Sequence, residues 1–312
     1  MNLPGTTFRG MAISPARLGM MVMLLAMFLF VANDAMGKWL VSTYSVGQVL
    51  LVRSAVALLI LAPFLWRVGI GPILRVQRPL LQVARVVFST AEVFCFYWAV
   101  SYLPLADVMT YWLAAPIYVA ALSPFLLGER VGLLRWTAIG LGFVGVLVAL
   151  TPSGEVHPFA IVVSVVGTLA FALMVLTGRS LRGTPDTVLV FFQILGALAA
   201  GLVLAPVGWA VPTGADLLLL GTLGVVAMLG HICVNRAVKL ADAAMVAPFQ
   251  YTLLPWAVLM GWMFFGDLPT ATMLAGAAII VVSGLVIYAA ETRGRALVPQ
   301  PDLGSDVRSR QD

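Results

Sequence analysis

Charged side chains inside long apolar stretches are the residues of this chain whose chemistry stands out. Asp34, Lys38 and Glu92 are the main examples. A charged side chain at the centre of a membrane helix costs roughly 2.5 to 3.5 kcal/mol on insertion scales, so such residues seldom face lipid. Asp34 and Lys38 are four residues apart and would share one face of a helix, where they can form an ion pair. The spacing supports two interpretations, a structural ion pair or direct contact with a substrate or a coupling ion.

Glu92 has no acidic or basic neighbour within one helical turn along the chain. Removal from water disfavours the charged form of a carboxyl group, which would let Glu92 carry a proton unless a cation keeps it ionised. Arg53 and Arg85 are the candidate cations. One interpretation is therefore an interhelical ion pair, and the other is proton coupling or recognition of a substrate amine.

His231 and Asn235 are also four residues apart and would share a helical face. Histidine titrates near neutral pH, so His231 would suit a proton pathway, although an interhelical hydrogen bond would also explain it. The other histidine, His157, is predicted at the opposite membrane face, and the two cysteines lack the spacing of a metal site. We therefore predict no metal site, no cofactor and no catalytic residues.

Two apolar stretches combine proline with aromatic and amide side chains. The first contains Tyr111, Trp112 and Pro116, and the second contains Pro248, Gln250, Tyr251 and Pro255. Proline removes a backbone hydrogen bond and kinks a helix, and membrane helices tolerate such breaks where they line a cavity. We predict a central cavity lined by these aromatic and amide residues together with Tyr97. The alternative is that the aromatic residues belong to belts at the membrane surfaces.

The elements that must position these residues are membrane helices. The chain has 312 residues, of which 62% are hydrophobic and 10% charged, and its mean hydropathy is +1.04. A membrane helix needs about 20 mostly apolar residues. Stretches of that length are apolar on every face, whereas barrel strands would alternate. We predict an all-α integral membrane protein with ten spans, near residues 19–41, 47–66, 80–102, 104–127, 133–151, 157–178, 188–207, 214–235, 243–265 and 270–290.

The positive charges predict the orientation of these spans. Short loops rich in Lys and Arg stay in the cytoplasm. With the N-terminus inside, 16 of the 18 Lys and Arg residues fall on the cytoplasmic side, and the exceptions are Lys38 and Arg53. We therefore predict a multi-pass protein of a bacterial inner membrane with both termini in the cytoplasm.

The chain carries an internal duplication. Residues 99–129 and 237–267 both open on Ala-Val and close on glycine plus a carboxylate, and a shift of 138 residues aligns them. Five spans per copy place the second copy upside down, and such inverted repeats suit alternating access around a midplane site. The predicted parts are a cytoplasmic N-terminal segment, a first repeat, an inverted second repeat and a disordered cytoplasmic tail, at residues 1–17, 18–151, 157–290 and 291–312.

Several motifs resemble those of a known family. They are Leu103-Pro104-Leu105-Ala106-Asp107, Pro116, Ser123-Pro124-Phe125-Leu126-Leu127-Gly128-Glu129-Arg130, Trp136 and Gly142-Phe143-Val144-Gly145-Val146, with weaker counterparts at Pro255, Gly266-Asp267, Gly276 and Gly284. Over residues 18–290 the sequence resembles the drug/metabolite transporter superfamily and, within it, the ten-helix EamA-type carriers. Asp267 stands where that family usually has Glu, which makes the second motif less diagnostic.

The resemblance implies a secondary transporter of small amphipathic metabolites, and not an enzyme. The segment from Asp34 to Leu40, with Arg53-Ser54, looks like the branch that holds bacterial amino-acid exporters and uptake carriers for riboflavin or S-adenosylmethionine. We predict export of amino acids, including aromatic ones, with uptake of a vitamin-like solute as the alternative. An intramembrane enzyme or a channel is a remote alternative, because the polar groups are dispersed and no selectivity filter is visible.

The expected partners are a small-molecule substrate and the lipid bilayer, with no nucleic acid. No phosphate-binding loop of the ATPase type occurs, so coupling would use an ion gradient, with protons as our hypothesis. Glycines on the fifth and tenth spans allow close packing, either within the chain or between two copies in a homodimer.

Overall fold

The computed structural model describes residues 15–69, 71–74, 76, 78–128, 132–149, 157–181, 183–240 and 247–296. Most of the predicted N-terminal segment and the tail beyond residue 296 lie outside the described residues. In chain order the elements are α1 (Pro15–Val41), α2 (Val46–Val68), α3 (Gly71–Leu74), α4 (Pro79–Val100), α5 (Leu105–Leu113), α6 (Ala115–Leu127), α7 (Leu133–Ala149), α8 (Pro158–Ser180), α9 (Asp186–Leu204), α10 (Gly214–Leu240), η1 (Ala247–Thr252), α12 (Leu253–Phe265) and α13 (Ala271–Ala296).

These elements confirm the ten predicted spans and the all-α membrane fold. Eight segments are long and apolar enough to cross a membrane, and α5 with α6 counts as one of them. The remaining two spans are α7, whose apolar part is Trp136–Ala149, and η1 with α12. Proline at the first position starts α4 and α8, where a missing N–H costs no hydrogen bond. Gly128 and Gly266, both in the left-handed conformation, end α6 and α12.

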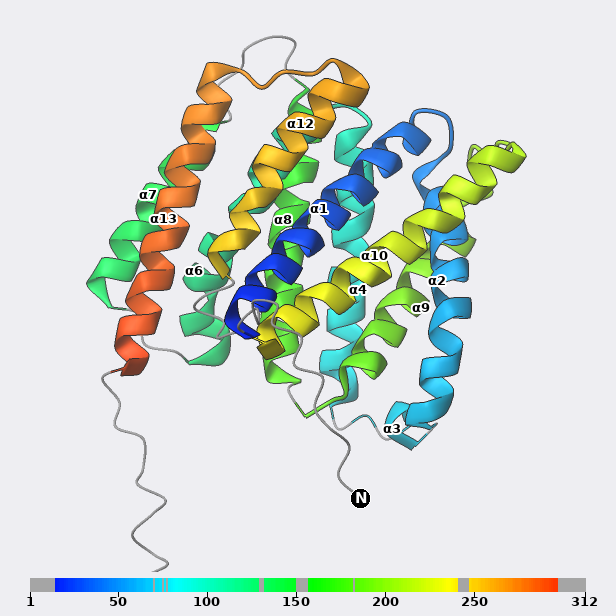
Figure 1. The fold of residues 1–312 in the computed structure, drawn as a ribbon, viewed down its shortest axis with the longest axis horizontal. Coiled ribbons are helices and arrows are strands. Elements are labelled where there is room, and N and C mark those ends of the chain that lie inside the picture. Colours follow the sequence, from blue (N-terminus) through cyan, green and yellow to red (C-terminus); the bar gives the residue numbers. More distant parts are fainter. Residues whose placement is uncertain are drawn as a thin grey trace, which may run out of the picture.

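The helices pair between the two halves of the chain (Figure 1). α1 packs along α10 and α4 along α8, while α2 packs along α9 and α7 along α13. The first and third spans, α1 and α4, correspond to the sixth and eighth spans, α8 and α10. Replacing each helix of the pair α1–α10 by its counterpart therefore gives the pair α8–α4. The same exchange leaves the other two pairs unchanged. This pattern is the one expected of two inverted five-helix repeats.

Two spans are broken near proline residues, as the sequence predicts. α5 ends at Leu113 and α6 begins at Ala115, one residue before Pro116. In the second half, the 3₁₀ segment η1 precedes α12, and Pro255 lies in the first turn of that helix. Pro248 lies within η1, but its side chain is outside the described residues. α5 and α12 contact each other, so the two broken spans meet inside the bundle.

The ends of the described chain lie at one end of the bundle. Figure 1 shows the start of α1 and the end of α13 at the same end, as an even number of crossings requires. The predicted tail begins too early, because α13 is helical through Ala296 and not only to residue 290. A helix whose backbone is already formed can continue into polar sequence, so the change to polar residues after residue 290 does not end α13.

Close glycine contacts bring several of these helices together. A Cβ atom on Gly276 would lie 2.7 Å from the Gly145 carbonyl oxygen, between α13 and α7. A Cβ atom on Gly201 would lie 2.5 Å from the Leu51 backbone nitrogen, between α9 and α2. Packing within the chain therefore explains these two contacts, while the homodimer stays a prediction.

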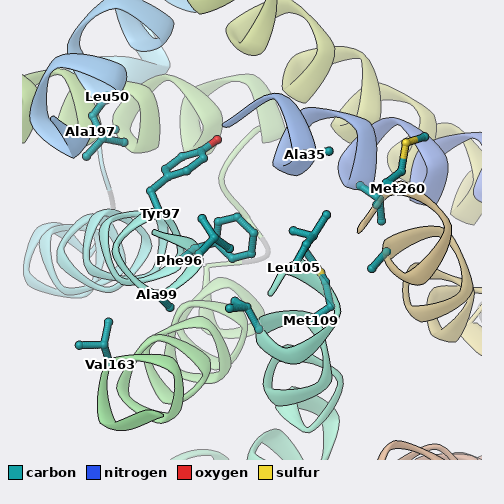
Figure 2. Close-up of a cluster of buried hydrophobic side chains, with 14 residues drawn as sticks. Ala35, Leu50, Phe96, Tyr97, Ala99, Leu105, Met109, Val163, Ala197 and Met260 are labelled. Carbon is teal, nitrogen blue, oxygen red and sulfur yellow. The ribbon is translucent and has the colours of Figure 1, made fainter. Parts of the chain in front are cut away.

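A buried apolar cluster fills the centre of the bundle (Figure 2). It joins α1, α2, α4, α5 and α12 through side chains that include Val31, Leu50, Phe96, Leu105 and Met260. Tyr97 belongs to the same cluster and is 1% exposed, and its hydroxyl group is directed toward α1. A Cβ atom at Gly37 of α1 would overlap the Tyr97 ring, so glycine at this position lets α1 approach α4. The cluster thus fixes the position of one buried hydroxyl group.

Candidate functional site

A hydrogen-bonded chain of polar groups links α1, α2 and α4 around the Tyr97 hydroxyl. Arg53 of α2 donates from Nη1 to the Tyr97 hydroxyl oxygen at 2.6 Å. Its guanidinium carbon is 5.3 Å from the centroid of the Tyr97 ring. Asn33 of α1 donates from Nδ2 to the same oxygen at 3.3 Å and to Oδ1 of Asp34 at 3.1 Å. The arginine, which the sequence analysis treats only as a partner for a carboxylate, is therefore held by a tyrosine.

Glu92 lies on the same helix as Tyr97 and has a different partner. Trp112 of α5 donates its indole N–H to Oε1 of Glu92 at 3.0 Å. Two of the predicted site residues are thus brought into direct contact. Sequence spacing could not predict this contact, because it depends on how α4 packs against α5.

Arg53 is the positive charge shared by this part of the bundle. It interacts electrostatically with both the Asp34 and the Glu92 carboxyl groups, and Asp34 and Glu92 also interact with each other. His231 on α10 interacts with the charges of Arg53 and Arg85. Asp34, Arg53, Glu92, Tyr97, Trp112 and His231, which we call the polar cluster, therefore combine two carboxyl groups with a nearby guanidinium and an imidazole.

Lys38 does not pair with Asp34, in contrast to the ion pair considered in the sequence analysis. Its ammonium group donates to Oδ2 of Asp267 at 2.7 Å and lies 4.6 Å from the centroid of the Phe265 ring. Asp267 follows α12 in the second half of the chain, and Asp107 at the start of α5 interacts with both charges. The i,i+4 interpretation is wrong because tertiary packing brings a carboxylate from 229 residues away against the lysine.

A cavity of about 330 Å³ lies between α2, α4, α9 and α10. Its polar lining consists of Arg53, Ser54, Ser89, Thr187, Gln193 and His231, and the rest is apolar. Such a volume suits a metabolite-sized ligand, and a mostly apolar wall with a few polar groups is typical of small-molecule sites. Arg53 lines this cavity and also contacts Tyr97, so it connects the cavity to the polar cluster.

The cavity lies away from the site that the aromatic and proline residues predict. Of the predicted residues whose side chains the structure describes, His231 alone is among those that line it. Tyr111 is 5% exposed, and Tyr251 packs beside Gly284 of α13 at a contact where a Cβ atom would overlap the hydroxyl group. Gln250 is exposed in η1, and the side chain of Asn235 lies outside the described residues. The structure therefore separates a cavity between α2, α4, α9 and α10 from the broken spans.

The cavity is also lined by Gln193, Thr187 and Ser89, which were not predicted from the sequence. Gln193 could have been predicted, because it is the one amide in the apolar stretch from residue 188 to residue 204. Thr187 and Ser89 could not, since hydroxyl side chains are common in membrane helices, where they bond to backbone carbonyls. Among the described residues, no group of three or more His, Cys, Asp or Glu side chains could hold a metal ion.

Comparison with known proteins places the chain in a transporter family. Residues 17–151 match the model of the EamA-like transporter family. A riboflavin transporter of Rhizobium johnstonii is 31% identical over 290 residues, which cover 91% of this chain and 95% of that protein. The chain belongs to the EamA-like transporter family. It is thus a multi-pass membrane protein of the drug/metabolite transporter superfamily and not an enzyme, as the sequence motifs predict.

Two further matches extend this assignment. A riboflavin transporter of Vibrio cholerae is 32% identical over 250 residues, covering 78% of this chain and 83% of that protein. A crystal structure with 16% sequence identity superposes with a TM-score of 0.60 over 91% of this chain and 99% of that one. At this identity the superposition indicates a shared fold alone.

Proposed function

We propose that this chain is an alternating-access carrier for a flat, uncharged or anionic metabolite of the riboflavin class. The composition of the cavity is the observation on which this proposal depends. Among the described residues that line it, Arg53 is cationic, Gln193, Thr187 and His231 can form hydrogen bonds, and none is acidic. A fused-ring imide such as riboflavin offers carbonyl and ring-nitrogen acceptors to these groups and an apolar ring surface to the remaining wall.

The charge of the cavity disfavours a cationic substrate. A sulfonium compound such as S-adenosylmethionine would place a positive charge near Arg53, with no acidic group among the described lining residues to balance it. Like charges repel strongly in a low-dielectric interior. Two relatives above 30% identity are named riboflavin transporters, which supports the same substrate class. Uptake into the cell is the direction that we propose.

The position of the cavity supports alternating access. Its lining reaches from Arg53 toward Phe64, near the end of α2, and Thr187, near the start of α9. Lys38 and Asp267 form their ion pair at the opposite ends of the spans, beyond the last turn of α12. One end of the bundle is therefore held together across the two halves, while the cavity extends toward the other end.

Export of amino acids is the second candidate function. The polar cluster favours it, because an amino acid needs a carboxylate for its amino group and a guanidinium for its carboxyl group. Asp34 and Glu92 lie near Arg53 and would supply this combination. The two functions differ in which residues contact the ligand, since riboflavin would occupy the cavity and an amino acid would need the carboxylates behind it.

Counterflow in liposomes tests the proposal. Purified protein would be reconstituted with an excess of unlabelled riboflavin inside, and entry of labelled riboflavin would be compared with S-adenosylmethionine and phenylalanine in parallel preparations. We expect accelerated exchange of riboflavin only. Exchange of phenylalanine without riboflavin would establish the second candidate, and exchange of S-adenosylmethionine would contradict the argument from cavity charge.

A pair of matched variants identifies the site. Gln193→Leu removes an amide from the cavity wall, whereas Gln250→Leu makes the same change in η1, among the residues that the sequence analysis favours. We expect Gln193→Leu to weaken riboflavin exchange by about tenfold, which corresponds to the loss of one or two hydrogen bonds, while Gln250→Leu leaves it unchanged. The reverse result would place the substrate between the broken spans.

A further inference from the structure

We propose that Asp34 and Glu92 form a proton-binding site, and that substrate bound in the cavity acts on this site through Arg53. The inference deepens the proposed function, because the cavity ligand is taken to be of the riboflavin class. It concerns the force that drives transport. Among the described residues that line the cavity, Arg53 and His231 are ionisable and none is acidic, whereas two carboxyl groups lie behind the wall.

The polar cluster holds two carboxyl groups and one guanidinium. Asp34 comes from α1 and Glu92 from α4, and each interacts with the other as well as with Arg53 of α2. No ion pair within 4 Å joins Arg53 to either carboxyl group among the described residues. A single guanidinium that is not in contact with either carboxylate cannot fully neutralise both in a low-dielectric interior. The pair is therefore balanced between two ionised carboxyl groups and one ionised plus one protonated group, and a change in the charge around Arg53 can shift this balance.

Each carboxyl group of the pair has one side-chain hydrogen-bond donor. Asp34 accepts one side-chain hydrogen bond from Asn33, and Glu92 accepts one from Trp112. Asn33 itself is 4% exposed, and its Oδ1 atom has no hydrogen-bond partner among the described residues. An unsatisfied acceptor beside a carboxyl group suits a site where an O–H group forms and disappears, because rotation of the amide would let Oδ1 accept that O–H.

Arg53 lies between the carboxyl pair and the cavity. One of its N–H groups is committed to the Tyr97 hydroxyl, and the side chain also lines the cavity. A ligand acceptor that bonds to the guanidinium brings negative charge density next to it. The two carboxyl groups then lose part of the positive potential that keeps them ionised, and their affinity for a proton rises.

The remaining titratable groups around the pair are few. Tyr97 and Cys95 come from α4, Arg53 comes from α2, and His231 comes from α10. α5 contributes the indole of Trp112, and the described cavity-lining residues of α9 are not titratable. His231 faces the positive charges of Arg53 and of Arg85 on α4, whereas the two carboxyl groups face each other. The carboxyl pair is therefore the proton acceptor of the cluster.

The resulting step is balanced in atoms and charge. When the ligand binds to Arg53, one proton from water forms an O–H bond with Asp34 or Glu92, and no other covalent bond changes. When the ligand leaves, the same O–H bond breaks and the proton returns to water. Ligand and proton then cross the membrane in the same direction.

A measurement without ligand tests the proton site first. Infrared difference spectra of the purified protein, recorded over a pH titration, report the C=O stretch of protonated carboxyl groups. At neutral pH, where exposed carboxyl groups are ionised, we expect such a band in the wild-type protein and its loss in the Asp34→Asn, Glu92→Gln double variant, with the single variants showing which group holds the proton. Asp216→Asn is the control, because this carboxylate accepts hydrogen bonds from Tyr44 and Thr213 outside the cluster. A band at neutral pH that survives in the double variant would overturn the proposal.

A measurement with riboflavin tests the coupling. Saturating riboflavin would be mixed with protein in a weakly buffered solution that contains a pH indicator. We expect the solution to become more alkaline with the wild-type protein and with Asp216→Asn, but not with the double variant. Binding of riboflavin by the wild-type protein without proton uptake would overturn the coupling. Failure of riboflavin to bind would refute the substrate class proposed above, and the infrared titration would still decide the proton site.

Discussion

The ammonium group of Lys38 lies 2.7 Å from the carboxylate of Asp267 and joins the two halves of the protein. Lys38 is near the end of α1, and Asp267 follows α12, so the contact connects the first span with the ninth. The side chains are 14% and 29% exposed, respectively. Any opening of the bundle between α1 and α12 at this end requires the two groups to separate.

Removal of this ion pair should change transport more than stability. Lys38→Met leaves the pair incomplete, and a partly exposed pair contributes at most about 1 kcal/mol, so we expect a small decrease in Tm. We expect a larger change in the rate of transport, because the closed arrangement of this end loses its cross-link. The charge swap Lys38→Glu with Asp267→Lys should restore the rate. Asp216→Asn is the control, since Asp216 accepts a hydrogen bond from Tyr44 in another contact between the two halves; an equal effect there would argue against a specific role of the pair.

The contact between Gly224 and the Arg53 backbone predicts a sharp difference between two alanine variants. A Cβ atom at Gly224 would overlap the Arg53 carbonyl oxygen, whereas a Cβ atom at Gly221 would lie 3.5 Å from Val56 in ordinary contact. Backbone cannot move aside as a side chain can, so Gly224→Ala should destabilise the protein by about 1 to 3 kcal/mol. Gly221→Ala on the same helix should have little effect. Thermal unfolding in detergent measures both, and equal Tm values would show that α2 and α10 pack less closely than described.

Thr90 offers a test of the buried polar groups. Its Oγ1 atom has no hydrogen-bond partner in the part of the chain that the structure describes, whereas Oγ1 of Thr110 donates to the Ala106 carbonyl at 3.0 Å. Replacing an unsatisfied hydroxyl by a methyl group of the same shape removes a desolvation penalty of about 1 to 3 kcal/mol. We therefore expect Thr90→Val to keep or raise the Tm, and Thr110→Val to lower it. A lower Tm for Thr90→Val would indicate a bound water or another partner at this hydroxyl.

The orientation in the membrane can be tested with two cysteine variants. Ser42 lies between α1 and α2, and Arg78 lies just before α4, and both are exposed. The distribution of positive charges predicts that Arg78 faces the cytoplasm and Ser42 the outside. In intact cells, a membrane-impermeant maleimide should label Ser42→Cys, and it should label Arg78→Cys only after the cells are opened. The double variant Cys95→Ser, Cys233→Ser is the background, and the opposite pattern would invert the topology.

The spans were predictable because length and hydrophobicity decide them. A stretch of about 20 apolar residues has few alternatives to a membrane helix, and the break before Pro116 follows from its missing N–H group. The end of α13 was misjudged because residues 291–296 are polar, and polarity does not stop a helix whose backbone is already formed.

The site was predictable only in part, because its contacts are made between distant segments. Spacing brings Asp34 and Lys38 to one helical turn, yet Lys38 is paired with Asp267, and Glu92 is paired with Trp112 from another helix. Arg53 was predicted as a partner for a carboxylate, and its contact with Tyr97 depends on the approach of α2 to α4. The sequence can therefore identify polar residues whose burial in a membrane helix is energetically costly. It cannot identify the residues that form hydrogen bonds or ion pairs with them.

The exchange relation among the helix pairs has a consequence for the second conformation that the proposed alternating access requires. α1 with α10 and α4 with α8 are counterparts in the two halves, so a difference between these two packings corresponds to two arrangements of the same pair of repeat helices. If each half took the arrangement of the other, the cavity would extend toward the Lys38 end and the closed contacts would form at the opposite end. We therefore expect the opposite-facing conformation to be the one in which the two halves have exchanged their arrangements.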